Sequence, residues 1–294
     1  MSLFTKRCAL AICTCIGLPL CPFGLAGANA STSVPLRILN GNILIVSICV
    51  NDRGPYDFVL DTGTNTTLIE PDLAASLQLH PVDRIALSTL TGSAPLPRYI
   101  VDSISIGKAF IPHVEMLSQA LPALHGLDGT VQGILGLNAL REFSFRIDNV
   151  QKRLDLFIDE PLPPFPKSRR VAAEVSQDRI LVPVSAEAAV GGAWKLELDS
   201  GISHVVVFGE KISRAKNGNA ATTRITTNFP GSPVATLRNE SFEVGPTRFN
   251  NFPIVVFDAR LSAPLPGKDG LLPVSLFRAI LFDRATSSLF FEAK

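Results

Sequence analysis

The sequence has few charged residues and almost no excess of either sign of charge. Only 18% of its 294 residues are Asp, Glu, Lys or Arg, against an average of about 25% in soluble domains. The formal net charge is +1, so the chain lacks the basic surplus typical of nucleic-acid-binding proteins. Because 46% of the residues are hydrophobic, the composition also argues against disorder. We expect a folded protein with no nucleic-acid partner.

Histidine clusters and serine-hydrolase motifs are also missing. The four histidines are dispersed without the spacing of metal ligands. They are His80, His113, His125 and His204. Ser203 and Ser241 lie outside any Gly-x-Ser-x-Gly context, which argues against a serine hydrolase. We expect no metal site and no cofactor.

Beyond the first 30 residues, no stretch approaches the length of a membrane span. Residues 1–30 instead have the three parts of a secretory signal peptide. These are the basic pair Lys6-Arg7, the uncharged segment 9–20 and the small-residue site Ala28-Asn29-Ala30. We predict cleavage after Ala30, a mature chain without a membrane span, and a periplasmic or secreted location. The alternatives are a retained anchor, which Pro19 and Pro22 interrupt, and lipidation at Cys21, which the bulky Leu20 disfavours.

Cysteine becomes scarcer still once this segment is removed. Four of the five cysteines lie within residues 1–30, and only Cys49 remains in the predicted mature chain. No internal disulfide is then possible, so the mature protein must depend on its hydrophobic core. Cys49 lies in the apolar run 43–50 and is interpreted as a buried structural thiol.

An internal repeat is the main positive signal in the sequence. The triplets Asp61-Thr62-Gly63 and Asp199-Ser200-Gly201 stand 138 residues apart. At matched offsets before each Asp lie a glycine, an aromatic residue and alternating apolar residues, which is the pattern of a strand with one buried face. Matched apolar runs follow each triplet, including Gly133-Ile134-Leu135-Gly136 and Gly270-Leu271-Leu272-Pro273. One unit has therefore been used twice.

The duplication divides the chain into four parts. Residues 1–30 are the signal peptide, 31–158 the N-terminal lobe, 159–172 a Pro-rich linker and 173–294 the C-terminal lobe. Four prolines between positions 161 and 166 make the linker extended. Two lobes of about 130 residues have ordinary domain sizes.

The repeated triplet has a chemical meaning. After a core strand, a Thr or Ser can hydrogen-bond within a tight turn, while Gly leaves room beside the Asp carboxylate. Two such turns related by a pseudo-twofold axis can bring their tips together. Two carboxyl groups about 3 Å apart share a proton, so one serves as general base on a water and the other as general acid.

The sequence resembles the aspartic proteases at these positions. The match lies in Phe58 to Thr64, in Leu196 to Gly201 and in the apolar-apolar-Gly run Ile134-Leu135-Gly136. This resemblance implies an all-β, bilobal pepsin-like acid protease fold made of two retropepsin-like β-barrel lobes with short helices. It also implies an aspartic endopeptidase that cleaves peptides or proteins with a water activated between Asp61 and Asp199. Because both Asp turns occur in one chain, we expect a monomer rather than lobes paired between chains. Thr62, Gly63, Thr64, Ser200 and Gly201 would support the two catalytic turns.

The sequence departs from the family pattern at three places. Pro273 replaces the glycine expected in the second lobe, which keeps open an inactive peptide-binding or scaffolding protein on the same fold. Ile202 stands where the first lobe has Thr64, whose hydroxyl would favour the charged form of Asp61. Asp199 is therefore expected to keep the shared proton, and activity to extend to less acidic pH. A flap hairpin is expected at 87–98 with Thr91, Gly92 and Ser93 at its tip, but without the usual flap tyrosine.

Overall fold

The computed structural model describes residues 31–294 except 90–91, 127, 160, 165–168, 177, 213–222, 226–234 and 258–266. Strands dominate these residues, and the longest helix among them, α1 (Pro71–Ser76), has six residues. The expectation of an all-β fold with short helices is confirmed. In the described part of the chain, the helices are all too short or too polar to cross a membrane.

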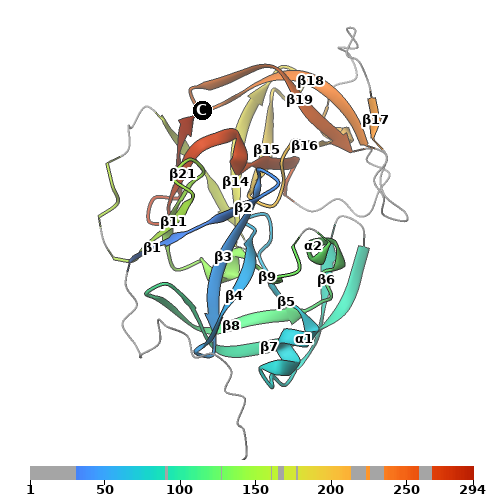
Figure 1. The fold of residues 1–294 in the computed structure, drawn as a ribbon. Coiled ribbons are helices and arrows are strands. Elements are labelled where there is room, and N and C mark those ends of the chain that lie inside the picture. The colour runs from blue at the N-terminus through green and yellow to red at the C-terminus, as the bar shows by residue number, and fades with distance from the viewer. Residues whose placement is uncertain are drawn as a thin grey trace, which may run out of the picture.

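The first half of the chain forms one eight-stranded sheet, drawn from blue to green in Figure 1. In sheet order its strands are β2 (Arg37–Leu39), β3 (Ile43–Val50), β4 (Arg53–Leu60), β9 (Val131–Leu135), β5 (Thr67–Ile69), β8 (Ala109–Ser118), β7 (Gly92–Ile106) and β6 (Asp83–Thr89). A further pairing between β3 and β7 closes this sheet on itself into a barrel.

The second half repeats the same sheet with the same order. Its strands are β13 (Glu174–Ser176), β14 (Arg179–Ala186), β15 (Ala193–Asp199), β20 (Gly270–Pro273), β16 (Val205–Phe208), β19 (Thr247–Phe257), β18 (Ala235–Val244) and β17 (Thr223–Ile225). The pairing of β14 with β18 corresponds to that of β3 with β7. The repeat inferred from the sequence is therefore a repeat of topology.

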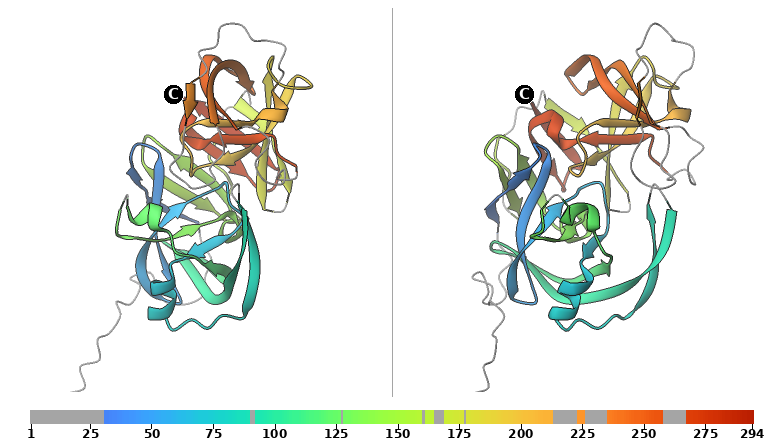
Figure 2. Two further views of the ribbon diagram at one scale, coloured as in Figure 1. Left: turned by 90° about the vertical axis from the view of Figure 1, so that its right-hand side faces the viewer. Right: turned by 45° about the vertical axis from the view of Figure 1, so that its right-hand side comes forward.

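A six-stranded sheet joins the two lobes, and each half of the chain supplies three of its strands (Figures 1 and 2). In order they are β1 (Thr32–Pro35), β11 (Arg153–Phe157), β10 (Ser144–Asp148), β21 (Phe277–Asp283), β22 (Ser288–Ala293) and β12 (Arg170–Ala172). The β10–β21 pair crosses from one lobe to the other, with Phe145 opposite Phe282. The last three residues of the segment interpreted as a linker are thus a strand of this sheet.

Burial of side chains in the core fixes the strands that lead to the two Asp turns. On β15, Trp194, Leu196 and Leu198 are at most 1% exposed and pack in the main core. On β4, Phe58 and Leu60 are fully buried in the same core, which runs through both lobes. Each Asp turn therefore starts from a strand that the core fixes in register.

Strands β9 and β20 pass between two neighbours, and a glycine makes each passage possible. A Cβ atom at Gly133 would lie 2.4 Å from the carbonyl oxygen of Leu68, and one at Gly270 would lie 2.0 Å from that of Val206. No other residue fits so close to a neighbouring backbone.

The structure corrects the interpretation of Cys49. This residue is 1% exposed in β3, as expected, but it is disulfide-bonded rather than a free thiol. The expectation assumed a chain shortened at Ala30, which has one cysteine, whereas the structure is that of the whole chain with five.

Candidate active site

The two repeated turns meet at the junction of the lobes and are tied together by their hydroxyl residues. Thr62 Oγ1 donates a hydrogen bond to the carbonyl oxygen of Leu198 (2.9 Å), and Ser200 Oγ donates to that of Leu60 (2.7 Å). Each hydroxyl oxygen also accepts the backbone N–H of the other residue, at 2.9 and 3.0 Å. The sequence suggested bonds within each turn. The hydroxyls instead bond across the lobes, because both turns are buried against each other.

This interlock brings the carboxyl groups of Asp61 and Asp199 together. Gly63 N–H donates to Asp61 Oδ1 (2.8 Å), and Gly201 N–H donates to Asp199 Oδ1 (2.7 Å). Each carboxyl group also packs on the glycine of the opposite turn: a Cβ at Gly63 would lie 2.4 Å from Asp199 Cγ, and one at Gly201 would lie 3.0 Å from Asp61 Cγ. The two glycines of the repeat are therefore needed for the approach of the two carboxyl groups.

Burial raises the pKa of both aspartates. For Asp61, the hydrogen bonds from Gly63 and from the Asp199 carboxyl partly oppose this rise. The pKa of Asp199 is raised well above its usual value, first by burial and then by the negative charge of Asp61. The two groups titrate as a pair, and Asp199 is the one whose pKa is raised well above its usual value.

The expected cause of this asymmetry is not the one that the structure shows. Thr64 Oγ1 donates to the carbonyl oxygen of Thr66 (3.3 Å) and accepts the N–H of Thr66 (3.2 Å), so its hydroxyl bonds within its own loop. The Thr64/Ile202 difference therefore does not act through a bond from Thr64 to Asp61. Glu197, two residues before Asp199, adds a negative charge that further raises the pKa of Asp199.

Pro273 fits the second lobe without a lost hydrogen bond. In the first lobe, Gly136 N–H donates to Thr67 Oγ1 (3.2 Å). The equivalent positions in the second lobe are Pro273, which has no N–H, and Val205, which has no hydroxyl, so donor and acceptor are absent together. Pro273 has a φ of −71°, the value that a proline ring imposes.

Three charged residues beside the dyad were not recognised from the sequence. Lys268 Nζ forms an ion pair with Glu197 Oε2, and Arg179 Nε lies 3.5 Å from Glu197 Oε1. The side chain of Glu197 is 0% exposed and that of Lys268 is 7% exposed. The available signal was a charge within the apolar run Leu196-Glu197-Leu198.

The hairpin expected to act as a flap is formed by β6 and β7. Asp83 pairs with Arg98 and Thr89 with Gly92. Thr91 lies outside the described residues, while Gly92 and Ser93 begin β7. In the right-hand view of Figure 2, the hairpin runs along the edge of the first lobe with its end directed toward the second. The corresponding hairpin of the second lobe is the β17–β18 pair. The residues that connect these two strands lie outside the described residues.

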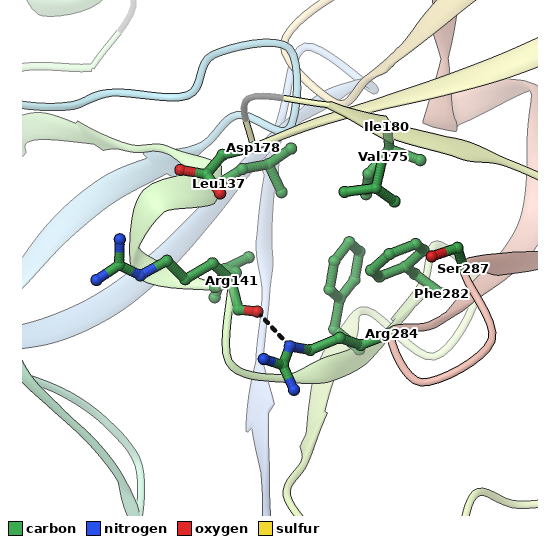
Figure 3. A pocket seen from close by; sticks show the side chains of 10 residues that line it. Leu137, Arg141, Val175, Asp178, Ile180, Phe282, Arg284 and Ser287 are labelled. Atoms are coloured by element: carbon green, nitrogen blue, oxygen red, sulfur yellow. Dashed lines mark hydrogen bonds between the residues drawn. The ribbon is translucent and has the colours of Figure 1, made fainter.

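A cavity of about 100 Å³ lies away from the dyad, beside the sheet that joins the lobes. Figure 3 shows Val175 and Ile180 on one side of it and Phe282 and Arg284 on the other. Neither aspartate lines this cavity, so it is not the site of the carboxyl pair. Across the described residues there is also no group of three or more His, Cys, Asp or Glu that could hold a metal ion.

Comparisons with known proteins agree with this geometry. Residues 46–139, which include the first Asp turn, match the family model described as aspartyl protease. Among solved structures, the aspartic proteinase from Irpex lacteus matches with a TM-score of 0.53 and 13% sequence identity, over 90% of this chain and 98% of that one. No curated protein matches the sequence. Residues 46–139 are thus similar to the aspartyl protease family, and the chain has the bilobal fold of the pepsin-like proteinases.

Proposed function

We propose that this protein is an aspartic endopeptidase in which Asp61 and Asp199 activate one water molecule for the hydrolysis of peptide bonds. The observation that carries the proposal is the interlock of the two Asp turns, with each carboxyl group packed on the glycine of the other lobe. A buried pair of carboxyl groups that shares a proton is the arrangement that this reaction requires. The family match and the fold make a peptide the expected substrate class.

The asymmetry of the pair assigns the two roles. Asp61 takes a proton from the water as the water oxygen bonds to the carbonyl carbon, and Asp199 gives its proton to the carbonyl oxygen. In the second step, the amide nitrogen takes the proton from Asp61 while the C–N bond breaks. A hydroxyl of the tetrahedral intermediate returns a proton to Asp199, and the starting state is restored.

The alternative of an inactive peptide-binding protein was motivated by Pro273. Val205 has no hydroxyl that would need the N–H that this proline lacks. Gly270, like Gly133, leaves room for a neighbouring carbonyl oxygen. Pro273 therefore gives no reason to prefer the inactive alternative.

Asp61→Asn and Asp199→Asn variants test the proposal on a mixed peptide library from acidic to neutral pH. We expect each to lower kcat/KM at least about 10²-fold, because each removes a general acid or base. Asp57→Asn, in β4 four residues before Asp61, changes a carboxyl group that pairs with Arg37 at 2.7 Å. It is the matched control and should remain active. A statine-type inhibitor should block the unmodified protein. If the unmodified protein cleaves no peptide at any of these pH values, the proposed function is wrong.

A further inference from the structure

An ion cluster lies next to the dyad on the second lobe, with two of its side chains buried and that of Arg179 half-buried. It consists of Glu197 on β15, Lys268 in the loop before β20, and Arg179 at the start of β14. Glu197 and Asp199 are two residues apart on one strand, so their side chains share a face. Glu197 Oε1 has no hydrogen-bond partner and only the contact with Arg179 at 3.5 Å.

The first lobe has no charge at the equivalent positions. In the two lobes, Phe58 pairs with Gly133 as Leu196 pairs with Gly270. Val131 stands two residues before Gly133, as Lys268 stands two residues before Gly270, although the first-lobe pairing has a register shift between Asp57 and Phe58. The register of β3 on β4 matches that of β14 on β15. By this match, Ile43 is equivalent to Arg179 and Val59 to Glu197.

These three first-lobe residues form an apolar cluster. Val59 and Val131 are 4% and 1% exposed, and Ile43 packs against them. The fold therefore does not need charges at these positions, and a well-packed apolar cluster serves in the first lobe. Burial of an ion pair at the same place usually gains no stability over apolar residues, so the charges in the second lobe call for another explanation.

We propose that Glu197, Lys268 and Arg179 are positioning residues that direct the shared proton of the dyad to Asp199 and so assign the acid and base roles. This inference rests on the proposed function and deepens it. Glu197 is the extra negative charge on the side of Asp199. Lys268 and Arg179 hold that charge in an environment where burial raises the pKa of Glu197.

The charged groups that face this cluster come from every element around it. Asp199 follows on the same strand, and Asp61 approaches from the first lobe, where it also raises the pKa of Glu197. Lys268 lowers the pKa of both aspartates, and Glu197 interacts with both of them. The asymmetry lies in the position of Glu197, which is on the strand that ends at Asp199, whereas Asp61 belongs to the other lobe.

Glu197→Gln removes the charge with little change of shape, and the double variant Glu197→Val with Lys268→Val installs the residues of the first lobe. The dyad is followed by carbon-13 NMR titration of labelled aspartates, with the Asp61→Asn and Asp199→Asn spectra as assignments. In Glu197→Gln, we expect the upper apparent pKa of the pair to fall and kcat/KM at pH 7 to drop roughly threefold to tenfold relative to its optimum. In the double variant, the two apparent pKa values should approach each other.

Glu174→Gln, which removes the exposed ion pair with Lys195 at 2.6 Å on the neighbouring strand pair, is the control and should leave the titration unchanged. Thermal unfolding shows whether each variant folds, and the double variant guards against a single variant that does not. Titration curves that coincide for the unmodified protein and both variants would overturn the inference. This result does not depend on peptide cleavage, so it is distinguishable from failure of the proposed function.

Discussion

Gly63 and Gly201 decide at the scale of single atoms whether the two carboxyl groups can meet. Each glycine is the surface on which the opposite carboxyl group rests, and the space at Gly63 is the smaller of the two. The repeat in the sequence predicts both glycines, but it predicts them for the conformation of each turn. Their role toward the other lobe follows only from the packing of the turns.

Gly63→Ala should therefore disrupt the dyad more than Gly201→Ala. Its Cβ would lie 2.4 Å from Asp199 Cγ, against 3.0 Å for the reverse contact. We expect Gly63→Ala to lose about 1–3 kcal/mol of stability through overpacking and most of its kcat/KM. Urea unfolding and peptide cleavage measure these effects. Gly129→Ala, with open space around the new methyl group, is the control, and equal losses in all three variants would contradict the argument.

The raised pKa of Asp199 also predicts how the stability of the folded protein depends on pH. Its pKa in the folded state is raised, so above the ordinary aspartate pKa of about 3.9 the folded state binds more protons than the unfolded state. Stability then falls as the pH rises toward the raised pKa, and the loss persists above it. Asp199→Asn removes this loss and keeps an oxygen for the bond from Gly201 N–H.

We expect Asp199→Asn to unfold at a higher temperature than the unmodified protein at pH 7, by the equivalent of about 1 kcal/mol, and at nearly the same temperature at pH 3. Calorimetry at both pH values checks this. Asp52→Asn, in an exposed turn, is the control. A variant that is less stable at pH 7 would show that the carboxylate stabilises the fold.

At the scale of elements, β9 and β20 show how the two copies have diverged while keeping one path. Both thread between two strands with a glycine at the closest approach. At their ends, the first lobe uses a hydrogen bond from Gly136 to Thr67, and the second uses the pair Pro273 and Val205. In the second lobe no hydrogen bond is lost, because Pro273 lacks the N–H donor and Val205 lacks the hydroxyl acceptor.

Pro273→Gly should accordingly destabilise the protein, although it restores the family residue. The new N–H would face Val205 and lack an acceptor, and glycine also adds freedom to the unfolded chain. Together we expect a loss of about 1–3 kcal/mol. The double variant Pro273→Gly with Val205→Thr should recover part of it, because the first-lobe hydrogen bond becomes possible. A double-mutant cycle from urea unfolding measures this coupling, and additive losses would contradict it.

At the scale of the whole molecule, a shared sheet, a continuous core and the crossed hydroxyl bonds hold the lobes together. The six-stranded sheet takes three strands from each half, and the main core includes residues of both. The four hydrogen bonds of Thr62 and Ser200 lie where the carboxyl groups meet. The lobes are thus one mechanical unit at the site of the proposed chemistry.

Thr62→Val and Ser200→Ala test the contribution of these crossed bonds. Each variant leaves a buried carbonyl oxygen and a buried N–H of the other lobe without its partner, so we expect about 1–3 kcal/mol of lost stability for each. The double variant should lose less than the sum, because the two hydroxyls share one network. Ser47→Ala, whose hydroxyl bonds Asp57 at the surface, should change stability by less than about 0.5 kcal/mol. Losses as small as that of the control would show that the interlock is dispensable.

Much of the fold and of the candidate site could be predicted from local patterns in the sequence. The period-2 alternation before each Asp, the turn triplets and the matched apolar runs are local patterns, and local patterns encode strands, turns and a duplication. Together with the resemblance to the aspartic proteases, they led to the expectation of an all-β bilobal fold and to the choice of Asp61 and Asp199 among 26 acidic residues. The path of the chain from one lobe to the other was harder to predict from the sequence. The strand at residues 170–172 was interpreted as part of the linker.

What only the tertiary structure decided are the contacts between residues far apart in the chain. Glu197 and Lys268 are separated by 71 positions, and Thr62 and Ser200 by 138. No local pattern specifies such partners, since they depend on how sheets close and lobes pack. The sequence by itself therefore determined which residues the two turns contain. The folded chain determined that the turns interlock and that one of the two carboxyl groups lies beside a buried ion cluster.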